Sequence, residues 1–315
     1  MRAPASSETV FGRCLLVVFA LVCLHASAVA GPFRVATYNV ETYLDQPTET
    51  RPHVKSPAAK AKIRECIRAA NPDVLALEEM GNTNALLELR ASLQAEGQVF
   101  PFWEQVQGFD TNIHVAVLSK LPIIARRPHT NDAFVLDGRS FLVKRGFAEL
   151  DLQATTNFTF TLIVAHLKSR LTTADADEAE ERLGEARALR GLIDARLTRE
   201  PGARLIVLGD FNDGKDAAST KEIIGRGRTK LFDTRPAERN GDTAVSEPPY
   251  HEPRSVAWTY FYGKTDEFSR IDYILLSPAM KNHWLPGETW IPTVANWGTG
   301  SDHRLIVAGF HTEEQ

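Results

Sequence analysis

Four β-rich runs follow one another between residues 113 and 166: IHVAVLS (113–119), PIIARR (122–127), LVKRGFAELDL (142–152) and NFTFTLIVAH (157–166). The connections between them are short and leave no room for helices. Strands that follow each other so closely pair as antiparallel hairpins. A (β/α)8 barrel needs a helix after every strand, so this segment argues against that fold.

The N-terminal flank of this segment alternates strands with helices. We expect strands at 33–40 and 73–77, and helices at 57–71 and about 83–96. Ser56-Pro57 is typical of an N-cap followed by the first helical residue, and Asn71-Pro72 ends the same helix. Cys66 lies on the apolar face of that helix, so we expect a buried and unreactive thiol.

The C-terminal flank contains the longest expected helix. We expect this helix at about 176–199, strands at about 204–208, 257–261, 271–277 and 304–311, and a polar surface loop at 235–256. The apolar stripe of the helix consists of Leu183, Ala186, Leu189, Ile193 and Leu197. Charged residues such as Glu178 and Arg182 are expected on its solvated faces. Without repeats or a linker, the chain predicts one α/β domain with two packed mixed sheets.

The first 30 residues have the layout of a secretory signal peptide. Arg2 and Arg13 precede the apolar run CLLVVFALVCL (14–24), and Ala28-Val29-Ala30 is an A-x-A cleavage site. The run is short for a helix that spans a bilayer. We therefore expect export to the periplasm or the medium, with no membrane anchor.

Composition is that of an ordinary globular protein. The chain has 315 residues, 43% of them hydrophobic and 24% charged, and a formal net charge of −4. These values exclude a disordered chain, a collagen-like fibre and a multi-pass membrane protein. Cleavage would leave 31–315 as one domain with a charge of −5 and Cys66 as its single cysteine, so no internal disulfide is expected. The small charge means that local groups or a metal must hold any polyanion.

Chemically active side chains occur at six strand-associated positions. They are Asn39, Glu78-Glu79, His166, Asp210 with Asn212, Asp272, and Ser301-Asp302-His303. Taken singly, most have a structural explanation as a turn former, a cap or a hydrogen-bonded core group. Asp272 is the exception, because an unpaired acid inside an apolar strand is costly. Together they predict a site at the rim of a sheet, where α/β proteins bind ligands.

The residue types indicate the chemistry of this site. Carboxylate and amide oxygens suit Mg²⁺ or Ca²⁺. A structural zinc site is not expected, because the chain lacks closely spaced Cys and His pairs. Two histidines beside a divalent ion suggest hydrolysis of a phosphate ester, in which the ion and an imidazole neutralise developing charge.

The same motifs, in the same order, resemble the endonuclease/exonuclease/phosphatase superfamily over essentially all of residues 33–311. The motifs are Thr37-Tyr38-Asn39-Val40, Leu77-Glu78-Glu79, Ala165-His166-Leu167, Gly209-Asp210-Phe211-Asn212, Arg270-Ile271-Asp272-Tyr273-Ile274-Leu275 and Ser301-Asp302-His303. The resemblance implies a four-layer sandwich, with two packed mixed β-sheets flanked by helices. Residues 115–123 (VAVLSKLPI) look like the central hairpin of that family.

The resemblance also implies a metal site. Glu79 would be the principal Mg²⁺ ligand, and Asn39 and Asp302 would complete or support the site. Mn²⁺ or Ca²⁺ is an alternative ion.

Five further residues receive catalytic roles from the resemblance. His303 would contact the scissile phosphate and exchange a proton, held in orientation by Asp272. Asp210 would position and activate the water. Asn212 and His166 would donate hydrogen bonds to the phosphate oxygens.

Three positions depart from the family pattern. Glu78 stands where the family usually has Gln, and its charge would either sharpen metal binding or point into solvent. His114 replaces a common Gly. Asn112 occupies the region where many nucleases of the family have a Tyr, so no phosphate-contacting Tyr is expected.

Three functions remain open at this point. The first is a secreted Mg²⁺-dependent nuclease, with a nucleic acid as substrate and local cations along its backbone: Arg126, Arg127, Lys144, Arg145, Lys168 and Arg170. The second is a phosphoesterase for a lipid or small molecule, with an apolar rim formed by Trp284 and Trp297; Trp290 is expected in the core. The third is a silent binding module, which the complete motif set disfavours. We prefer the nuclease, and we expect a monomer with no stable protein partner.

Overall fold

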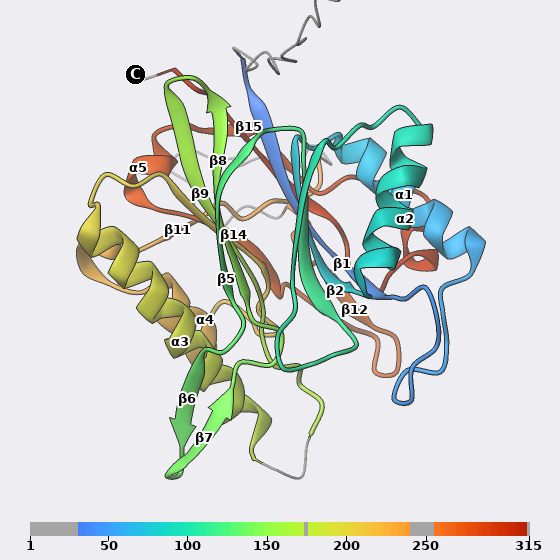
Figure 1. Ribbon diagram of the computed structural model, residues 1–315, viewed down its shortest axis with the longest axis horizontal. Helices are drawn as coiled ribbons and strands as arrows, with labels where there is room; N and C mark the ends of the chain where they lie inside the picture. The colour runs from blue at the N-terminus through green and yellow to red at the C-terminus, as the bar shows by residue number, and fades with distance from the viewer. Residues whose placement is uncertain (1–30, 173–175, 240–254, 314–315) are drawn as a thin grey trace, which may run out of the picture.

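The computed structural model describes residues 31–172, 176–239 and 255–313. Two six-stranded sheets stand face to face in this part of the chain, with helices on both outer sides (Figure 1). The predicted four-layer α/β sandwich is therefore confirmed. The expected signal peptide at 1–30 and most of the expected loop at 235–256 lie outside the described residues.

The first sheet carries both ends of the described chain. Its strands, in order, are β15 (Trp284–Trp290), β16 (Ile306–Phe310), β1 (Phe33–Tyr43), β2 (Val74–Met80), β4 (His114–Ser119) and β3 (Phe102–Val106). β1 and β2 are parallel, and the other neighbours are antiparallel. A parallel pair needs a crossover, and helix α1 (Pro57–Ala70) provides it.

The second sheet repeats this arrangement. Its strands, in order, are β11 (Phe232–Asp233), β14 (Asp272–Leu276), β10 (Leu205–Asp210), β9 (Phe158–His166), β8 (Phe147–Thr155) and β5 (Ile123–His129). β9 and β10 are parallel, and the long helix α3 (Glu178–Arg199) connects them. The other neighbours are antiparallel.

The remaining elements lie outside the two sheets. They are helices α2 (Thr83–Ala95), α4 (Ala218–Ile224) and α5 (Pro278–Lys281), the 3-10 turns η1 (Gly227–Thr229) and η2 (Trp297–Thr299), and two small hairpins, β6–β7 (Ala133–Leu136, Arg139–Leu142) and β12–β13 (Tyr260–Tyr262, Glu267–Ser269). No helix in the described part of the chain combines the length and apolar character needed to cross a membrane.

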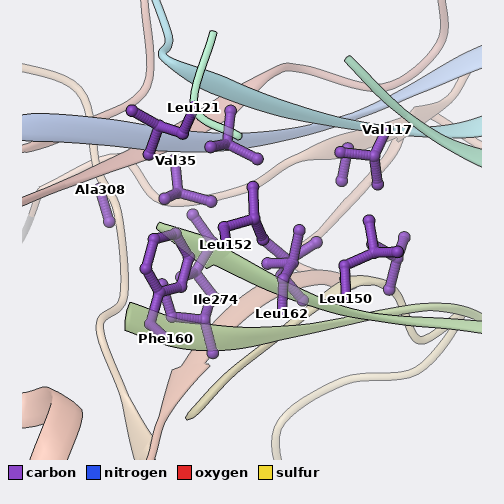
Figure 2. Close-up of a cluster of buried hydrophobic side chains, with 14 of the residues drawn as sticks. Val35, Val117, Leu121, Leu150, Leu152, Phe160, Leu162, Ile274 and Ala308 are labelled. Carbon is purple, nitrogen blue, oxygen red and sulfur yellow. The ribbon is translucent and has the colours of Figure 1, made fainter. Parts of the chain in front are cut away.

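Three apolar layers hold the sandwich together. Between the sheets, Val35 and Val117 from one sheet face Leu152, Phe160 and Ile274 from the other (Figure 2). A second layer joins the first sheet to α1 and α2, and a third joins the other sheet to α3 and α4. Because both sheets are covered on both faces, their strands are nearly continuous apolar runs. Burial of each such Leu, Ile or Phe contributes about 1.5–3 kcal/mol.

Local signals in helix α1 behave as expected. The Ser56 side chain accepts a hydrogen bond from the backbone N–H of Ala59 at 3.2 Å, and Asn71 ends the helix in the left-handed conformation with φ 45°. Cys66 is buried, and burial raises the pKa of its thiol. The helix therefore docks its Cys66 face on the first sheet, and the thiol is buried as expected.

The expected hairpin at 115–123 is wrong. β4 belongs to the first sheet and β5 to the second, so the chain passes between the sheets at Leu121-Pro122. The Pro122 carbonyl oxygen accepts a hydrogen bond from the Gln153 N–H at 3.0 Å, which joins the turn to β8. Short connections in sequence therefore do not guarantee pairing when two sheets are stacked.

Two further expectations need correction. The expected strand at 257–261 begins only at Tyr260, and it pairs in the separate β12–β13 hairpin instead of either main sheet. The expected solvated face of α3 exists only in part. Glu180 and Arg187 are exposed, but Arg182, Glu185 and Arg190 are buried together with Glu181. Glu185 accepts backbone N–H groups of the loops next to the helix, and these bonds compensate the burial of its carboxylate.

Candidate active site

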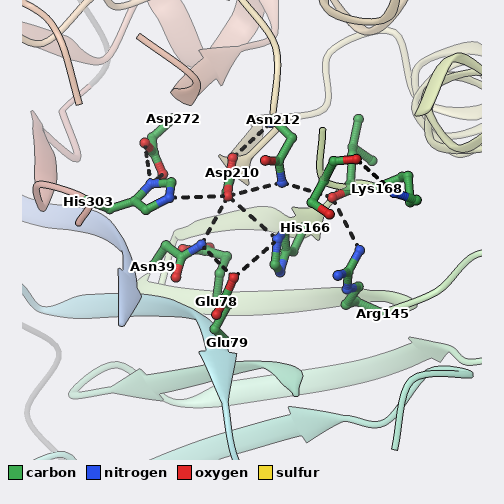
Figure 3. Close-up of polar contacts among 12 residues, drawn as sticks. Asn39, Glu78, Glu79, Arg145, His166, Lys168, Asp210, Asn212, Asp272 and His303 are labelled. Atoms are coloured by element: carbon green, nitrogen blue, oxygen red, sulfur yellow. Dashed lines mark hydrogen bonds and ion pairs between the residues drawn. The ribbon is translucent and has the colours of Figure 1, made fainter. Parts of the chain in front are cut away.

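Strand register brings the polar strand ends together. In the second sheet, Asp210 at the end of β10 lies opposite His166 of β9 and Asp272 of β14. In the first sheet, Asn39 of β1 is level with Glu78 of β2. The two rows meet at one edge of the sandwich, where they form a single polar cluster (Figure 3). Asn39 and Asp210, which are 171 positions apart in sequence, thus come within hydrogen-bond distance.

Asp210 is the centre of this cluster. Its Oδ2 accepts hydrogen bonds from Asn39 Nδ2 at 3.0 Å and from Asn212 Nδ2 at 3.2 Å. The same oxygen lies 3.5 Å from His166 Nε2 and 3.7 Å from His303 Nε2. Five of the predicted site residues therefore surround one buried carboxylate oxygen or carry it.

His303 is held in one orientation by its neighbours. Its Nδ1 lies 3.0 Å and 3.2 Å from the two carboxylate oxygens of Asp272. The Ser301 hydroxyl accepts the His303 backbone N–H at 3.0 Å and donates to the Asn39 carbonyl oxygen at 2.7 Å. An Nδ1–H that donates to Asp272 leaves Nε2 directed at Asp210, where a proton can be exchanged with a bound group.

Glu79 reaches the cluster through an irregular backbone. Its φ is 59°, and the pairing of β1 with β2 shifts register between Asn39 and Tyr43. The Glu79 Oε2 accepts the Thr42 N–H at 2.9 Å, and Oε1 lies 3.5 Å from Asn39 Nδ2. Glu41 and Thr42 also have positive φ. Non-glycine residues in this region cost about 1–3 kcal/mol each, and such strain concentrates at functional sites.

The two histidines have opposite protonation. Burial lowers the pKa of His166 well below its ordinary value, and the charges of Arg145, His303 and Arg51 lower it further. Burial also opposes protonation of His303, but the charges of Asp272 and Asp210 outweigh it and raise its pKa well above the ordinary value. His166 is therefore a neutral imidazole, and His303 is an imidazolium.

The pKa values of two acids of the site, Asp210 and Asp302, are raised. Burial raises the pKa of Asp210 to about 7, and the nearby charge of Asp272 adds to this rise while His303 opposes it. Burial likewise raises the pKa of Asp302 to about 6, with further contributions from Glu41 and Glu79. Carboxylates that repel one another in this way fit a site for a divalent cation, which would offset their charge.

A metal ion therefore fits the residues expected to bind it. The side chains of Glu79 and Asp302 are only partly buried, so two carboxylates are accessible at the rim of the cluster. The Asn39 Nδ2 lies 3.5 Å from Glu79 Oε1, and the Asn39 Oδ1 accepts the Glu41 N–H at 2.9 Å. Asp210, Asp272 and His303 form another acidic and imidazole group with ligand atoms within 4.8 Å of one another. In that group, Asp272 is already engaged with His303 Nδ1.

Glu78 neither adds a charge that could sharpen metal binding nor points into solvent. Its side chain is fully buried, and it accepts a hydrogen bond from the Thr37 hydroxyl at 2.6 Å. Burial raises its pKa well above the ordinary value, so it is a neutral acid. His114 is buried too, and Asn112 donates its backbone N–H to Asp110. A protonated Glu therefore replaces the usual Gln without adding charge to the site.

Five of the six cations expected to line a nucleic-acid backbone are engaged in other contacts. Arg126 pairs with Glu104 at 2.7 Å, and Arg127 pairs with Glu149 and Asp151. The other three engaged cations are Lys144 with Glu181, Lys168 with the backbone carbonyls of Ser169 and Leu171, and Arg170 with the carbonyl of Asn212. Arg145 alone among the six lacks a close partner and influences His166 electrostatically.

The three tryptophans considered for an apolar rim pack against other groups. Trp290 is in the core, as expected, and Trp284 packs against Phe232 at the edge of the sandwich. Trp297 packs on Trp258 with ring centroids 5.5 Å apart. The aromatic group that does reach the site is Tyr260, whose ring centroid lies 4.8 Å from that of His303. Its only sequence signal was the aromatic run at 258–262.

Comparisons with known proteins agree with this geometry. The Endonuclease/Exonuclease/phosphatase family model matches residues 36–303. The structure resembles the human Nocturnin catalytic domain with bound sulfate, at 15% identity and a TM-score of 0.57 over 90% of this chain and 95% of that one.

Two bacterial structures are also similar. A beta toxin of Staphylococcus aureus shows 15% identity and a TM-score of 0.58 over 90% of this chain and 100% of that one. Sphingomyelinase C of Streptomyces griseocarneus shows 18% identity and a TM-score of 0.53 over 89% and 99%. At these identities the likeness concerns the fold alone. No curated protein sequence matches the chain.

Proposed function

Because this chain belongs to the endonuclease/exonuclease/phosphatase family, whose members are phosphoesterase hydrolases, we propose that it is a secreted nuclease dependent on a divalent metal, most favourably Mg²⁺. The observation that carries this proposal is the position of Asp210. Its Oδ2 lies 3.7 Å from the Nε2 of a charged imidazole and accepts hydrogen bonds from two amides. A base, an acid and neutral donors are thus gathered around one point, as phosphodiester hydrolysis requires.

Four residues perform the proton transfers and bind the phosphate. Asp210 orients the attacking water and accepts its proton while the water oxygen bonds to phosphorus. The bond from phosphorus to the leaving oxygen breaks on the opposite side, and His303 donates its Nε2 proton to that oxygen. Asn212 and the neutral His166 donate hydrogen bonds to the non-bridging oxygens.

The metal is expected at Glu79, with Asn39 and Asp302 in support. A bound divalent ion supplies positive charge that stabilises the negative charge on the phosphoryl oxygens. Asp272 keeps the Nε2 of His303 directed at Asp210 and maintains its charge.

Incubation with supercoiled plasmid and single-stranded DNA tests the nuclease. We expect degradation with Mg²⁺, and loss of activity in EDTA and in the His303→Ala variant. His129→Ala is the matched control, because His129 of β5 pairs with Asp132 and Glu149 outside the site. DNA that stays intact with Mg²⁺ would contradict the proposal.

A phosphoesterase for lipids is the second candidate, and one observation favours it. The β12–β13 hairpin next to His303 exposes Phe268 and Tyr262, which are 55% and 36% accessible. Release of phosphocholine from sphingomyelin liposomes, without DNA degradation, would select this alternative. A silent binding module is disfavoured, because all eight predicted site residues are present in the cluster or at its rim.

Secretion rests on the sequence of residues 1–30. Expression of the full chain in a bacterium should yield exported protein that begins after Ala30. Recovery of cytosolic protein that retains residues 1–30 would contradict it. Monomeric behaviour remains a prediction, to be tested by light scattering.

A further inference from the structure

Arg145 is a buried cation with too few partners. Its residue is 6% exposed, and its guanidinium makes one hydrogen bond, at 3.5 Å, to the Leu167 carbonyl oxygen. The nearest carboxylate oxygen is Asp110 Oδ2, at 3.8 Å from Nε, and Nε itself has no hydrogen-bond partner. A guanidinium carries five N–H donors, so most of its hydrogen-bonding capacity is unused.

Other buried arginines of the described chain show what a purely structural role requires. Arg182 bonds to Asp213 at 3.0 Å and to the Lys168 carbonyl at 3.1 Å, with two longer carbonyl contacts. Arg190 pairs with Asp194 and bonds to three backbone carbonyls. Both are as deeply buried as Arg145. Since an unpaired buried charge is costly, Arg145 differs from them by lacking a counter-ion in close contact.

The backbone around Arg145 is firmly positioned. The Lys144 N–H bonds to Glu185 at 2.9 Å, and the Lys144 carbonyl accepts the Asp110 N–H at 2.6 Å. Gly108 packs so closely against residues 144–146 that a Cβ on it would overlap their backbone. The incomplete contacts of Arg145 therefore do not arise from a loose loop.

Arg145 and a second arginine flank the site next to His166. Arg51 reaches the same Asp110 Oδ2 at 3.6 Å, so one carboxylate serves two guanidinium groups and leaves a net positive charge. Both arginines act electrostatically on His166, which lies between Arg145 and Asp210 in Figure 3. Arg145 and the Asp210–His303 centre thus lie on opposite sides of His166 in this view, and Arg51 is linked to Arg145 through the shared Asp110 carboxylate.

We propose that Arg145 and Arg51 form a subsite for a second phosphate group, next to the one that is cleaved, in a polynucleotide substrate. The inference rests on the proposed nuclease function and deepens it. The cleaved phosphate belongs among Asp210, Asn212 and His303, so a cation beyond His166 meets the neighbouring phosphate of the strand. A lipid or sugar ester with one phosphodiester has no group to fill this subsite.

Binding of labelled thymidylate oligomers tests the subsite without relying on catalysis. Fluorescence anisotropy in EDTA compares a dinucleotide, which has one phosphodiester, with a tetranucleotide, which has several. We expect Arg145→Gln to weaken tetranucleotide binding about 10- to 100-fold, and by clearly more than it weakens dinucleotide binding. Arg51→Gln, at a more exposed position, should act in the same direction with a smaller effect. Loss of one phosphate contact should also reduce the salt slope by about 0.7.

Arg126→Gln is the matched control, because it removes the same charge from a surface ion pair on β5. Thermal unfolding identifies a variant that fails to fold; in that case Arg51→Gln and Arg145→Lys provide the readout. The subsite proposal would be overturned if the tetranucleotide bound equally well to Arg145→Gln, Arg51→Gln and Arg126→Gln. Equal losses for both oligomers, or Arg145-dependent binding of phosphatidylglycerol vesicles without oligonucleotide binding, would also overturn it.

Failure of the subsite differs from failure of the function. If the wild-type protein cleaves DNA but binds oligomers independently of Arg145, the nuclease proposal stands and the subsite proposal fails. The protein could instead hydrolyse neither DNA nor bis(4-nitrophenyl) phosphate and still bind oligomers in an Arg145-dependent way. The subsite proposal would then stand and the nuclease proposal would fail.

Discussion

Replacing Asp272 by Asn removes a negative charge that lies 3.0 Å from His303 Nδ1 and leaves the side-chain volume almost unchanged. Both groups are buried, so solvent screens their attraction little. Two unit charges at this distance attract by about 5 kcal/mol at an effective dielectric constant of about 20. Asp210 and Asp302 retain part of the field, at 3.7 Å and 4.0 Å from Nε2. We therefore expect Asp272→Asn to lower the pKa of His303.

The rate and its pH dependence should both change. The proposed mechanism requires ionised Asp210 and protonated His303, which predicts a bell-shaped profile of kcat/KM. The acid limb follows Asp210, whose pKa burial raises to about 7 and a bound cation would lower. In Asp272→Asn the alkaline limb should move to lower pH, and kcat should fall about 10²- to 10⁴-fold at neutral pH, which is the contribution of a positioned proton donor.

The assay is kcat/KM for a labelled thymidylate oligomer, whose alkoxide leaving oxygen needs a proton, across the neutral and alkaline range, with the NMR titration of the His303 ring as a direct readout. Asp233→Asn is the control, because Asp233 pairs with Arg270 at 2.7 Å and does not touch His303. An unmoved alkaline limb, with a rate within about threefold of the wild type, would refute the assignment of His303 as the proton donor.

Three shorter predictions follow from other contacts. Gly209→Ala should lower the free energy of unfolding in urea by more than about 3 kcal/mol, because φ is 131° and a Cβ would overlap the Ala165 carbonyl oxygen; a loss below about 1 kcal/mol would contradict this. Glu78→Gln should stabilise the protein more at alkaline than at acidic pH. Burial raises the pKa of Glu78 in the folded state, so the wild type loses stability as the pH rises from the ordinary pKa of Glu through the raised one, and Gln does not. Equal effects of the substitution at both pH values would contradict this prediction. Mg²⁺ should raise Tm more at about pH 8 than at about pH 5, because Asp302, whose pKa burial raises to about 6, is fully ionised only at the higher pH. Glu79→Gln should increase the Mg²⁺ concentration required at least about tenfold; a pH-independent effect would argue against these ligands.

Much of the fold was predictable because its signals are local. The Ser56 cap, the Asn71 stop and the apolar runs that became β1, β2 and β10 depend on neighbouring residues only. The hairpin expected at 115–123 failed for the opposite reason. Whether two adjacent strands pair or separate into two sheets depends on which apolar faces need covering, and that is a property of the whole sandwich.

The buried charges of α3 show the same limit at a single helix. An Arg or Glu such as Arg182 or Glu185 is normally read as solvent-facing, because burial of a charge is costly. Here the loops beside the helix supply backbone groups and Asp213, which compensate that cost. These partners lie 14 to 41 residues away in sequence, and no periodicity within the helix reveals them.

The sequence by itself determined the chemical inventory of the site, because Asn39, Glu79, His166, Asp210 and the Asp302-His303 pair stand at strand ends in a recognisable order. Only the tertiary structure decided the state of each group. Burial and the charges that packing brings near it make Glu78 neutral, His166 neutral and His303 charged. The tertiary structure also shows that Arg145, unlike the other five predicted cations, is buried without a close partner. Protonation and pairing depend on distances across the sandwich, which residue order along the chain does not specify.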